Sequence, residues 1–372
     1  MRKSDLTLIL VATLLVLSLG ISVLAFPQKR YSEVENRALT PLALPSATDF
    51  FDGSALTRLS AAYADQFPFR STLTSLKAQM ERLLGKQENN GVFFGKEGYL
   101  IARCEYEDLT VLQENLCAIS ALFRATDLPV SLLIAPRAMD VMSHCLPNSY
   151  EADPAPFELL SQSGIPYTLP IDLLRTEARE GLSVWYKTDH HWTTLGAYLA
   201  YTAIAESLGI SPYPLSYFSQ ETVSEEFLGT TYSGIGAVKT EPDSVILFRY
   251  EGDEEYLVTR SDTGETLRGF YRFDALEKKD QYEIFLGGNF SRLSISLPHE
   301  QNRPRLLLIK DSFANSLVPF LALHFDLELV DPRYEKTGLL DLLRSRDLDR
   351  ILVLQGLDTL ATDRSLARRV QS

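Results

Sequence analysis

Two short segments carry the residue types that acyl-transfer chemistry needs. The first is Lys310-Asp311-Ser312, which directly follows the apolar run 306–309. A serine at the carboxyl end of a buried parallel strand lies where α/β sheets bind ligands. If a helix begins there, its free N–H groups can stabilise an oxyanion while the hydroxyl attacks a carbonyl. Asp and Ser are also ordinary helix N-caps, so this segment alone leaves both roles open.

The second segment is Asp189-His190-His191-Trp192, in a chain with only five histidines. In extended backbone, residues two apart point to the same side, so Asp189 and His191 can lie side by side. A carboxylate beside an imidazole fixes its tautomer and supports the imidazolium, as a general base requires. Thr193 is a predicted N-cap, and a nearby helix N-terminus disfavours a charged His191. The alternatives are a metal site, for which no third ligand with convincing spacing is visible, and a purely structural pair.

A third segment, Gly287-Gly288-Asn289, follows a short apolar run. Backbone N–H groups of such a turn, together with a side-chain amide, can approach a ligand closely enough to form an oxyanion hole. The same residues are typical of a type I′ hairpin turn, so both interpretations stay open.

Composition excludes several classes of protein. The chain has 372 residues, 45% of them apolar and 23% charged, which is ordinary globular composition. Its net charge of -13 makes binding to nucleic acid improbable. The three cysteines form no C-x-x-C pair, which argues against a zinc ribbon or a thioredoxin-type site, and a single disulfide would leave one thiol over. We expect no metal and no cofactor.

The N-terminus predicts export. An uncharged run of 21 residues, 6–26, is long enough as a helix to cross a bilayer, and Arg2 and Lys3 precede it. Cations on that side keep the N-terminus cytoplasmic and place the body outside the cell membrane, as a single-pass protein. A cleaved signal peptide is the rival, with Val23-Leu24-Ala25 as its cleavage site. We therefore predict an anchor over residues 1–27 and an extended tether over residues 28–50.

The remaining pattern predicts an α/β ectodomain over residues 51–360. Helical spacing over 51–86 is interrupted by Pro68, and 92–101 is typical of a hairpin. Buried apolar strands then alternate with helices, which indicates a parallel sheet flanked by helices. The predicted strands are 130–135, 166–171, 305–309, 327–330 and 351–354, and the predicted helices include 155–163, 195–208 and 313–324. The polar stretch 213–300 predicts a β-rich, antiparallel insertion, and 361–372 a C-terminal tail.

Several of these segments together resemble the bacterial DHHW protein family, whose name repeats the letters of residues 189–192. The other landmarks, in the expected order, are 34–37, 65–70, 91–95, 310–313 and 330–334. The resemblance covers about residues 30 to 355. The family in turn looks like a relative of the alginate O-acetyltransferases, periplasmic proteins with an SGNH-hydrolase-like fold that work beside a membrane-bound acyltransferase.

The resemblance implies roles for individual residues. Asp189 and His191 match an Asp-x-His motif and Ser312 matches the nucleophile, so these three are the expected catalytic triad, and His190 should point away. Arg333 could orient an anionic or sugar substrate. Gly288 and Asn289 are our candidates for the oxyanion hole, by chemistry rather than by a motif. The chain departs from the acetyltransferases at Lys310, where they have glycine.

We therefore predict O-acetylation, or deacetylation, of a cell-envelope polysaccharide through an acyl-Ser312 intermediate. The expected partners are that polysaccharide, the membrane and a membrane-bound acyltransferase, and no nucleic acid. The alternative is a non-catalytic envelope protein that binds glycan or an assembly partner on an SGNH-like scaffold. A metal-dependent hydrolase is a third reading, and it predicts that His190 and His191 both face the ion.

Overall fold

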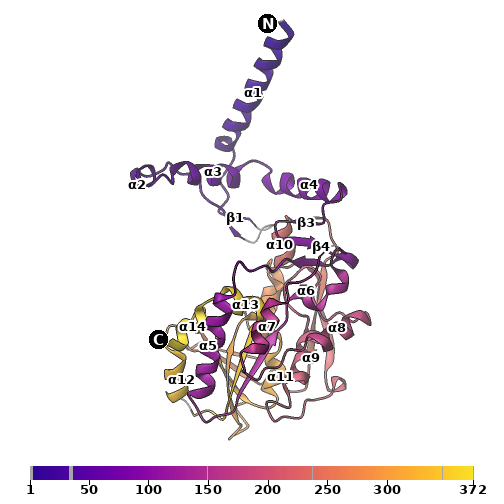
Figure 1. Cartoon of the computed structure of the whole chain (residues 1–372), viewed down its shortest axis with the longest axis vertical. Coiled ribbons are helices and arrows are strands. Elements are labelled where there is room, and N and C mark those ends of the chain that lie inside the picture. The colour runs from indigo at the N-terminus through magenta and orange to yellow at the C-terminus, as the bar shows by residue number, and fades with distance from the viewer. Residues whose placement is uncertain (1–2, 33–36, 149, 237, 346, 372) are drawn as a thin grey trace. The chain divides into compact units, whose positions relative to one another are not determined.

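The structure is a computed structural model that describes residues 3–32, 37–148, 150–236, 238–345 and 347–371. Contacts within the chain divide it into two compact units (Figure 1). The N-terminal unit comprises residues 1–90 and 232–239, and the sheet unit comprises residues 91–231 and 240–372.

Helices dominate the N-terminal unit. Its first helix, α1 (Lys3–Ala25), contains a stretch from Asp5 to Val23 with a mean hydropathy of 2.6, and it is the one helix among the described residues that is long and apolar enough to cross a membrane. The predicted apolar helix is therefore confirmed, with the length and composition that a membrane anchor or a signal sequence requires. The other elements of this unit are α2 (Ala47–Phe51), α3 (Ala55–Gln66), α4 (Arg70–Leu83), β1 (Tyr31–Ser32), β2 (Arg37–Ala38) and β3 (Glu88–Asn89).

The segment predicted as an extended tether is hydrogen bonded to the end of α3. Arg37 donates two bonds to the carboxylate of Asp65, at 3.1 and 2.5 Å, and the Thr40 N–H donates to the same carboxylate at 2.9 Å. The Gln66 amide bonds both the N–H and the carbonyl of Lys29, each at 2.9 Å. Part of one predicted landmark, Val34-Glu35-Asn36, lies outside the described residues.

A seven-stranded mixed sheet forms the centre of the sheet unit, in the order β10-β9-β11-β13-β12-β14-β6. Four neighbouring strands are parallel: β13 (Asp326–Val330), β12 (Arg305–Lys310), β14 (Arg350–Gly356) and β6 (Val130–Ala135). Three more are antiparallel: β9 (Leu257–Arg260), β10 (Thr266–Arg268) and β11 (Arg292–Ser296). The α/β prediction is confirmed, but the sheet is mixed rather than parallel, because strands from the 213–300 stretch extend it.

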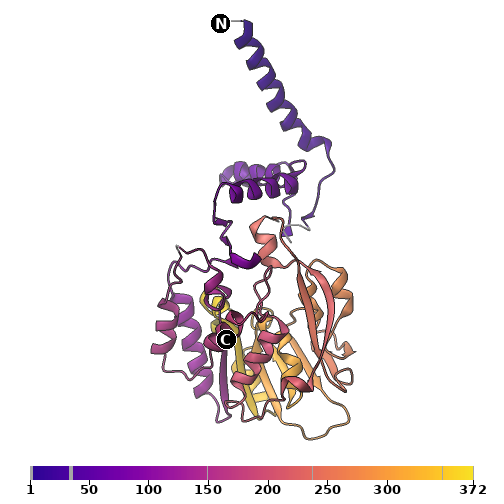
Figure 2. The ribbon, with the colours of Figure 1, turned by 90° about the vertical axis from the view of Figure 1, so that its right-hand side faces the viewer.

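Helices cover both faces of this sheet (Figure 2). Side chains of β12 alternate between two hydrophobic clusters: Leu306 and Leu308 belong to one, and Leu307 and Ile309 to the other. The second cluster includes side chains of α5 (Thr110–Arg124), α7 (Ala155–Gln162), α12 (Leu339–Ser345), α13 (Leu357–Thr362) and α14 (Ser365–Gln371). The first includes side chains of α6 (Ala138–Val141), α8 (Ile171–Arg179), α9 (Thr194–Ile204) and α11 (Val318–Ala322).

Some predicted elements differ from the structure. The segment 166–171 forms only an isolated bridge from Thr168 to Leu133 before α8 begins. Residues 361–372, predicted as a tail, contain α14, whose Leu366 and Val370 are buried in the second cluster. The hairpin over 92–101 is present as β4 (Val92–Phe94) and β5 (Leu100–Ala102). The other elements are β7 (Ser219–Phe227) paired antiparallel with β8 (Asp243–Arg249), and α10 (Thr230–Ile235).

Candidate active site

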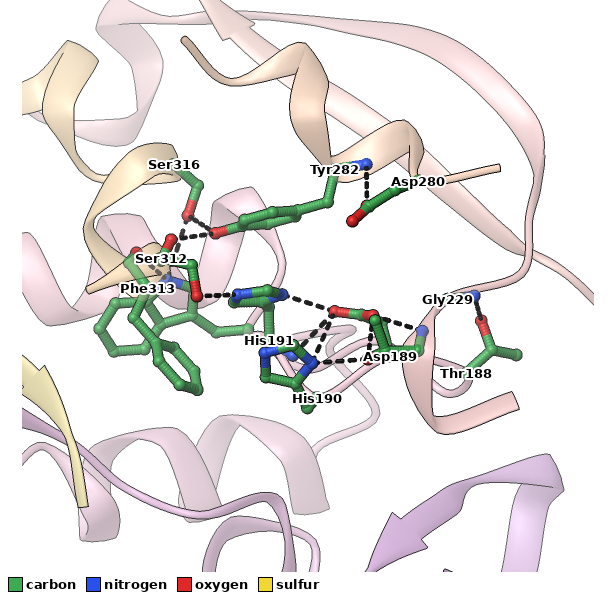
Figure 3. A network of polar contacts seen from close by, with 12 residues as sticks. Thr188, Asp189, His190, His191, Gly229, Asp280, Tyr282, Ser312, Phe313 and Ser316 are labelled. Atoms are coloured by element: carbon green, nitrogen blue, oxygen red, sulfur yellow. Dashed lines mark hydrogen bonds and ion pairs between the residues drawn. The ribbon is translucent and has the colours of Figure 1, made fainter. Parts of the chain in front are cut away.

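Ser312, His191 and Asp189 form a hydrogen-bonded row in the sheet unit (Figure 3). Ser312 Oγ lies 2.8 Å from His191 Nε2, and His191 Nδ1 lies 2.6 Å from Asp189 Oδ1. Both ring nitrogens of His191 are thus occupied, one by the hydroxyl and one by the carboxylate. This is the geometry that a base-activated nucleophile requires.

The first residue of α10, Thr230, holds the Asp189 carboxylate on the side away from His191. Its second oxygen accepts hydrogen bonds from Thr230 N and Thr230 Oγ1, each at 2.8 Å. Gly229 leaves room for this approach, since a Cβ at that position would lie 2.4 Å from Asp189 Oδ2. Burial alone would raise the pKa of Asp189, but the two neighbouring imidazoles and these hydrogen bonds lower it below its ordinary range. The carboxylate is therefore ionised.

His191 is held neutral despite its carboxylate partner. Burial and the neighbouring His190 outweigh Asp189 and lower the pKa of His191 to about 4. The ring of Tyr282 stacks on the imidazole, with centroids 3.8 Å apart and planes within 6°. Because Tyr282 OH also donates to the Ser312 carbonyl at 3.2 Å, one side chain contacts both the base and the nucleophile segment.

The nucleophile stands in a tight turn after β12. A short 3-10 helix spans Ser312–Ser316 and is separate from α11, so the helix predicted over 313–324 is broken in two. Asp311 caps this turn: its carboxylate accepts from Phe313 N at 3.0 Å and from Gly356 N at 2.7 Å. Burial raises the pKa of Asp311, and those N–H donors oppose the shift. The structure places Asp311 as a cap while Ser312 Oγ faces His191, so capping by Asp311 leaves the serine hydroxyl available.

Two tryptophans pair across the segment that carries the histidines and fix its conformation. Trp185 and Trp192 form an antiparallel bridge, and Trp192 Nε1 donates to Phe313 O at 3.0 Å and to Ser316 Oγ at 3.1 Å. Thr193 caps α9 by accepting from Gly196 N at 3.2 Å, as predicted. Trp192 therefore ties the histidine segment to the serine turn.

A pocket of about 160 Å³ lies beside Ser312 at the carboxyl edge of the parallel strands. Each of the four parallel strands is followed by residues that line it: Pro136 after β6, Ser312 after β12, Arg333 after β13 and Leu357 after β14. Parallel sheets place ligands at this edge, as the sequence predicted.

Arg333 is one of two arginines that line this pocket. Asp331, which is fully buried, accepts from Arg333 Nε at 2.9 Å and Nη2 at 2.6 Å. Nη1 has no hydrogen-bond partner among the described residues, and 27% of the side chain is exposed. Burial would lower the pKa of Arg333, but the Asp331 carboxylate raises it, so the guanidinium stays charged. The structure thus brings the predicted substrate-orienting residue to the serine.

Gly288 and Asn289, the predicted oxyanion donors, contact other groups. Asn289 Oδ1 accepts from Lys310 Nζ at 2.9 Å, and the Gly288 N–H donates to the Phe285 carbonyl at 3.4 Å while the Gly288 carbonyl accepts from Asn315 Nδ2. Lys310 is buried, bonds Asn315 Oδ1 at 2.7 Å, and lies 4.0 Å from Asp331. Burial lowers the pKa of Lys310 to about 8. The lysine that replaces glycine therefore points into a polar interior network rather than toward His191.

His190 lies beside His191 rather than away from it. Its Nδ1 is 2.6 Å from Thr230 Oγ1 and 3.7 Å from Asp189 Oδ1, and its ring lines the pocket. Asp189, His190 and His191 have potential ligand atoms within 4.8 Å of one another. A metal ion there would have to displace Asp189 or Ser312 from His191, because both ring nitrogens are in use.

Sequence reasoning missed the residues that support this row. Tyr282 and Thr230 contact the triad from the 213–300 stretch, and Asp243 accepts from the N–H groups of Lys187 and Thr188, each at 2.8 Å. Arg137, held by Asp140 at 2.7 and 2.8 Å, lines the same pocket. The Thr-rich and Tyr-rich composition of 213–300 was the one feature of the sequence that pointed to these supporting residues.

All three cysteines are unpaired.

Comparison with solved structures shows the fold. A DHHW family protein from Eubacterium siraeum is 20% identical with a TM-score of 0.60, covering 75% of this chain and 95% of that one. Bacillus cereus PatB1 with a sulfonyl adduct is 17% identical with a TM-score of 0.62, covering 74% and 97%. The O-acetyltransferase domain of Pseudomonas putida AlgJ is 15% identical over 73% and 93%, but its TM-score of 0.45 is too low to support a conclusion. No curated protein is significantly similar to the chain.

The DHHW protein family model matches residues 164–330. This range contains Asp189, His191 and Ser312 as well as the supporting Thr230 and Tyr282. The resemblance of this chain to the DHHW protein family is thereby confirmed.

Proposed function

We propose that the chain is an extracytoplasmic serine-dependent acyl-transfer enzyme. The observation that carries the proposal is the row from Ser312 Oγ through His191 to Asp189, at 2.8 and 2.6 Å. Ser312 follows a parallel strand and an Asp-x-His pair supplies the base, which agrees with the SGNH-hydrolase-like arrangement that the family resemblance implies. A neutral imidazole, held by an ionised carboxylate, can accept the serine proton at ordinary pH.

The reaction has two half-reactions. His191 Nε2 takes the Ser312 proton as Oγ attacks the acyl carbonyl, and the imidazolium then protonates the leaving group, which leaves acyl-Ser312. In the second half, His191 deprotonates an acceptor hydroxyl, which attacks the acyl carbon, and the imidazolium returns the proton to Ser312 Oγ as the bond between that oxygen and the acyl carbon breaks. A sugar hydroxyl makes the enzyme an O-acetyltransferase, and water makes it an esterase.

We reassign the oxyanion hole to Ser312 N–H and Arg333. The Ser312 N–H has no partner among the hydrogen bonds of the described residues, and the unpaired Nη1 of Arg333 belongs to the same pocket. Asp331 holds the guanidinium in place, so little reorganisation is needed when charge develops. Gly288 and Asn289 then support the turn through Lys310 and Asn315 instead of contacting the oxyanion.

The proposed setting is the outer surface of a cell membrane. Residues 1–27 form the anchor with the N-terminus cytoplasmic, 28–50 the tether and 51–360 the ectodomain. A cell-envelope polysaccharide is the proposed acceptor, in line with the resemblance to alginate O-acetyltransferases, and a membrane-bound acyltransferase is the proposed acyl source. Co-purification of such a partner in mild detergent tests this last point, and its consistent absence would count against it.

Acetyl-ester turnover by the full-length protein in detergent tests the chemistry. p-Nitrophenyl acetate is the substrate, and intact-mass analysis looks for acetyl on Ser312. A sulfonyl fluoride is a second probe, since PatB1, which shares the fold, has been solved with a sulfonyl adduct. Turnover and labelling that both disappear in Ser312→Ala support the proposal. Equal background rates and no labelling would instead favour a non-catalytic protein that binds envelope glycan or an assembly partner.

A further inference from the structure

Two helices of the N-terminal unit present apolar rows to the outside. In α4, Leu73, Leu76, Met80 and Leu83 follow one another at helical spacing and are 49%, 52%, 55% and 87% exposed. In α3, Leu56 and Leu59 are 75% and 40% exposed. Single exposed apolar residues are normal, but a continuous row along successive turns marks a surface that contacts something apolar.

The rest of α4 has the polarity of a helix at an interface. Ala78, which is buried at 1% exposure, faces away from the apolar row, about 160° around the helix from Met80. Within α4, Arg70, Lys77 and Arg82 outnumber Glu81, the one acidic residue. An apolar row on a helix whose polar residues are mostly basic is typical of helices that lie in the surface of a bilayer.

The junction between α3 and α4 is held close to the end of α1. Gln66, the last residue of α3, exchanges two hydrogen bonds with Lys29, four residues after α1 ends. Phe69, just before α4, contacts Phe26 with ring centroids 5.8 Å apart, and Tyr63 OH donates to Leu19 O at 3.3 Å. These contacts all lie within the N-terminal unit, which Figure 1 draws with α3 and α4 at the end of α1.

This placement identifies what covers the apolar rows. If α1 crosses a bilayer over Asp5–Val23, four extended residues carry the chain no more than about 14 Å beyond the helix. That upper limit is about twice the thickness of the headgroup region on one side of a bilayer, which is about 5–8 Å, so the junction of α3 and α4 stays close to the lipid surface. Tyr63 and Phe69 would then lie at the depth where amphipathic aromatic side chains are enriched.

We infer that α3 and α4 lie in the phospholipid surface of the membrane that α1 enters. Leu73, Leu76, Met80 and Leu83 contact the acyl chains, and Lys77, which borders this row, contacts lipid phosphates. The inference goes beyond the acyl-transfer chemistry and rests only on the proposed membrane anchor. It gives the sheet unit a second attachment, so the protein is held to the bilayer by a surface as well as by a span.

Quenching of an inserted tryptophan by brominated phospholipid tests the inference. The full-length protein carrying Leu76→Trp is reconstituted in phosphatidylcholine and phosphatidylglycerol vesicles, with and without bromine on the acyl chains. The matched control is Arg82→Trp, about 120° around the same helix and also exposed. The unsubstituted protein supplies the background from Trp185 and Trp192, which are both buried. We expect quenching at Leu76→Trp at least about twofold stronger than in the control.

Three results would overturn the inference. One is equal quenching of the two variants. Another is a blue shift of Leu76→Trp that depends on protein density and not on bromine, which would indicate a second copy as the occupant. The third is an intact mass that shows cleavage after α1. Acetyl-ester turnover is measured on the same vesicles. Quenching as expected without turnover refutes the proposed chemistry alone. Turnover without the expected quenching refutes only the contact of α3 and α4 with the membrane surface.

Discussion

The two units of this protein treat polar and apolar groups in opposite ways. In the sheet unit, charged side chains such as Asp189, Asp331 and Lys310 are buried, and each has a partner of fixed geometry. In the N-terminal unit, Leu76 and Leu83 stand exposed on a helix. Buried polar groups are preorganised for a reaction, whereas an exposed apolar row is completed only by another phase or partner. Substitutions in one unit should therefore leave the property of the other unchanged.

The largest expected effect is on the nucleophile and its base. Ser312→Ala and His191→Ala should each lower acetyl-ester turnover by about 10³-fold or more, because neither group can be replaced by water at that position. Urea unfolding of each variant checks that the fold persists. A variant with intact fold and near-normal turnover would refute the proposed triad.

Substitutions of Arg333 and Asn289 should affect different properties, turnover in the first case and stability in the second. Arg333→Gln should lower turnover by about 10²-fold, the usual cost of losing an oxyanion donor. Asn289→Ala should instead lower the free energy of unfolding by about 1–3 kcal/mol, because it removes an acceptor from the buried Lys310 ammonium. Steady-state kinetics and urea unfolding on both variants measure the contrast. A larger catalytic loss in Asn289→Ala would restore the oxyanion role predicted from the sequence.

The pH profile should reflect the lowered pKa of His191. The base form exists above its pKa of about 4, so kcat/KM should stay level down to about pH 5 and fall as the pH approaches 4. An imidazole at its ordinary pKa of 6.5 would already fail near pH 6. Since His190 lowers the pKa of His191, His190→Gln should move the acidic limb upward. His191 also affects stability, because its imidazole takes up a proton near pH 6.5 in the unfolded chain but only near pH 4 in the folded one. The free energy of unfolding should therefore decrease as the pH falls from 6.5 toward 4. A limb that stays near pH 6 in both proteins would contradict this account.

The two smallest expected effects are treatments that should leave acetyl-ester turnover unchanged. Dialysis against EDTA should leave turnover unaltered, because both His191 nitrogens are used by Ser312 and Asp189. A loss that zinc restores would favour the metal-dependent reading instead.

Leu76→Glu should likewise leave acetyl-ester turnover in detergent within about twofold of normal, since surface substitutions away from a site are usually near neutral. A large loss of turnover would show that the apolar row serves the site, and the contrast between the units would fail.

Local sequence predicted much of this structure. The apolar run before Ser312, the Asp-x-His spacing and the N-cap at Thr193 depend on neighbours in the chain, and all three appear as predicted. The misplaced elements depend on distant contacts. The stretch 213–300 supplies sheet strands as well as Tyr282 and Thr230, and spacing along the chain does not reveal which strand a segment will join. The contact of Asn289 is hidden for the same reason, since its partner Lys310 is 21 residues away in the sequence.

The indole of Trp192 joins segments that are 121 residues apart and on opposite sides of the 213–300 stretch. Contacts between segments so far apart in the sequence carry a large loop-closure cost and slow folding. A chain in which these two segments have not yet met has the right residues but no activated serine. Reactivity toward a sulfonyl fluoride would then report completed folding, and its appearance during refolding would follow the burial of this one tryptophan.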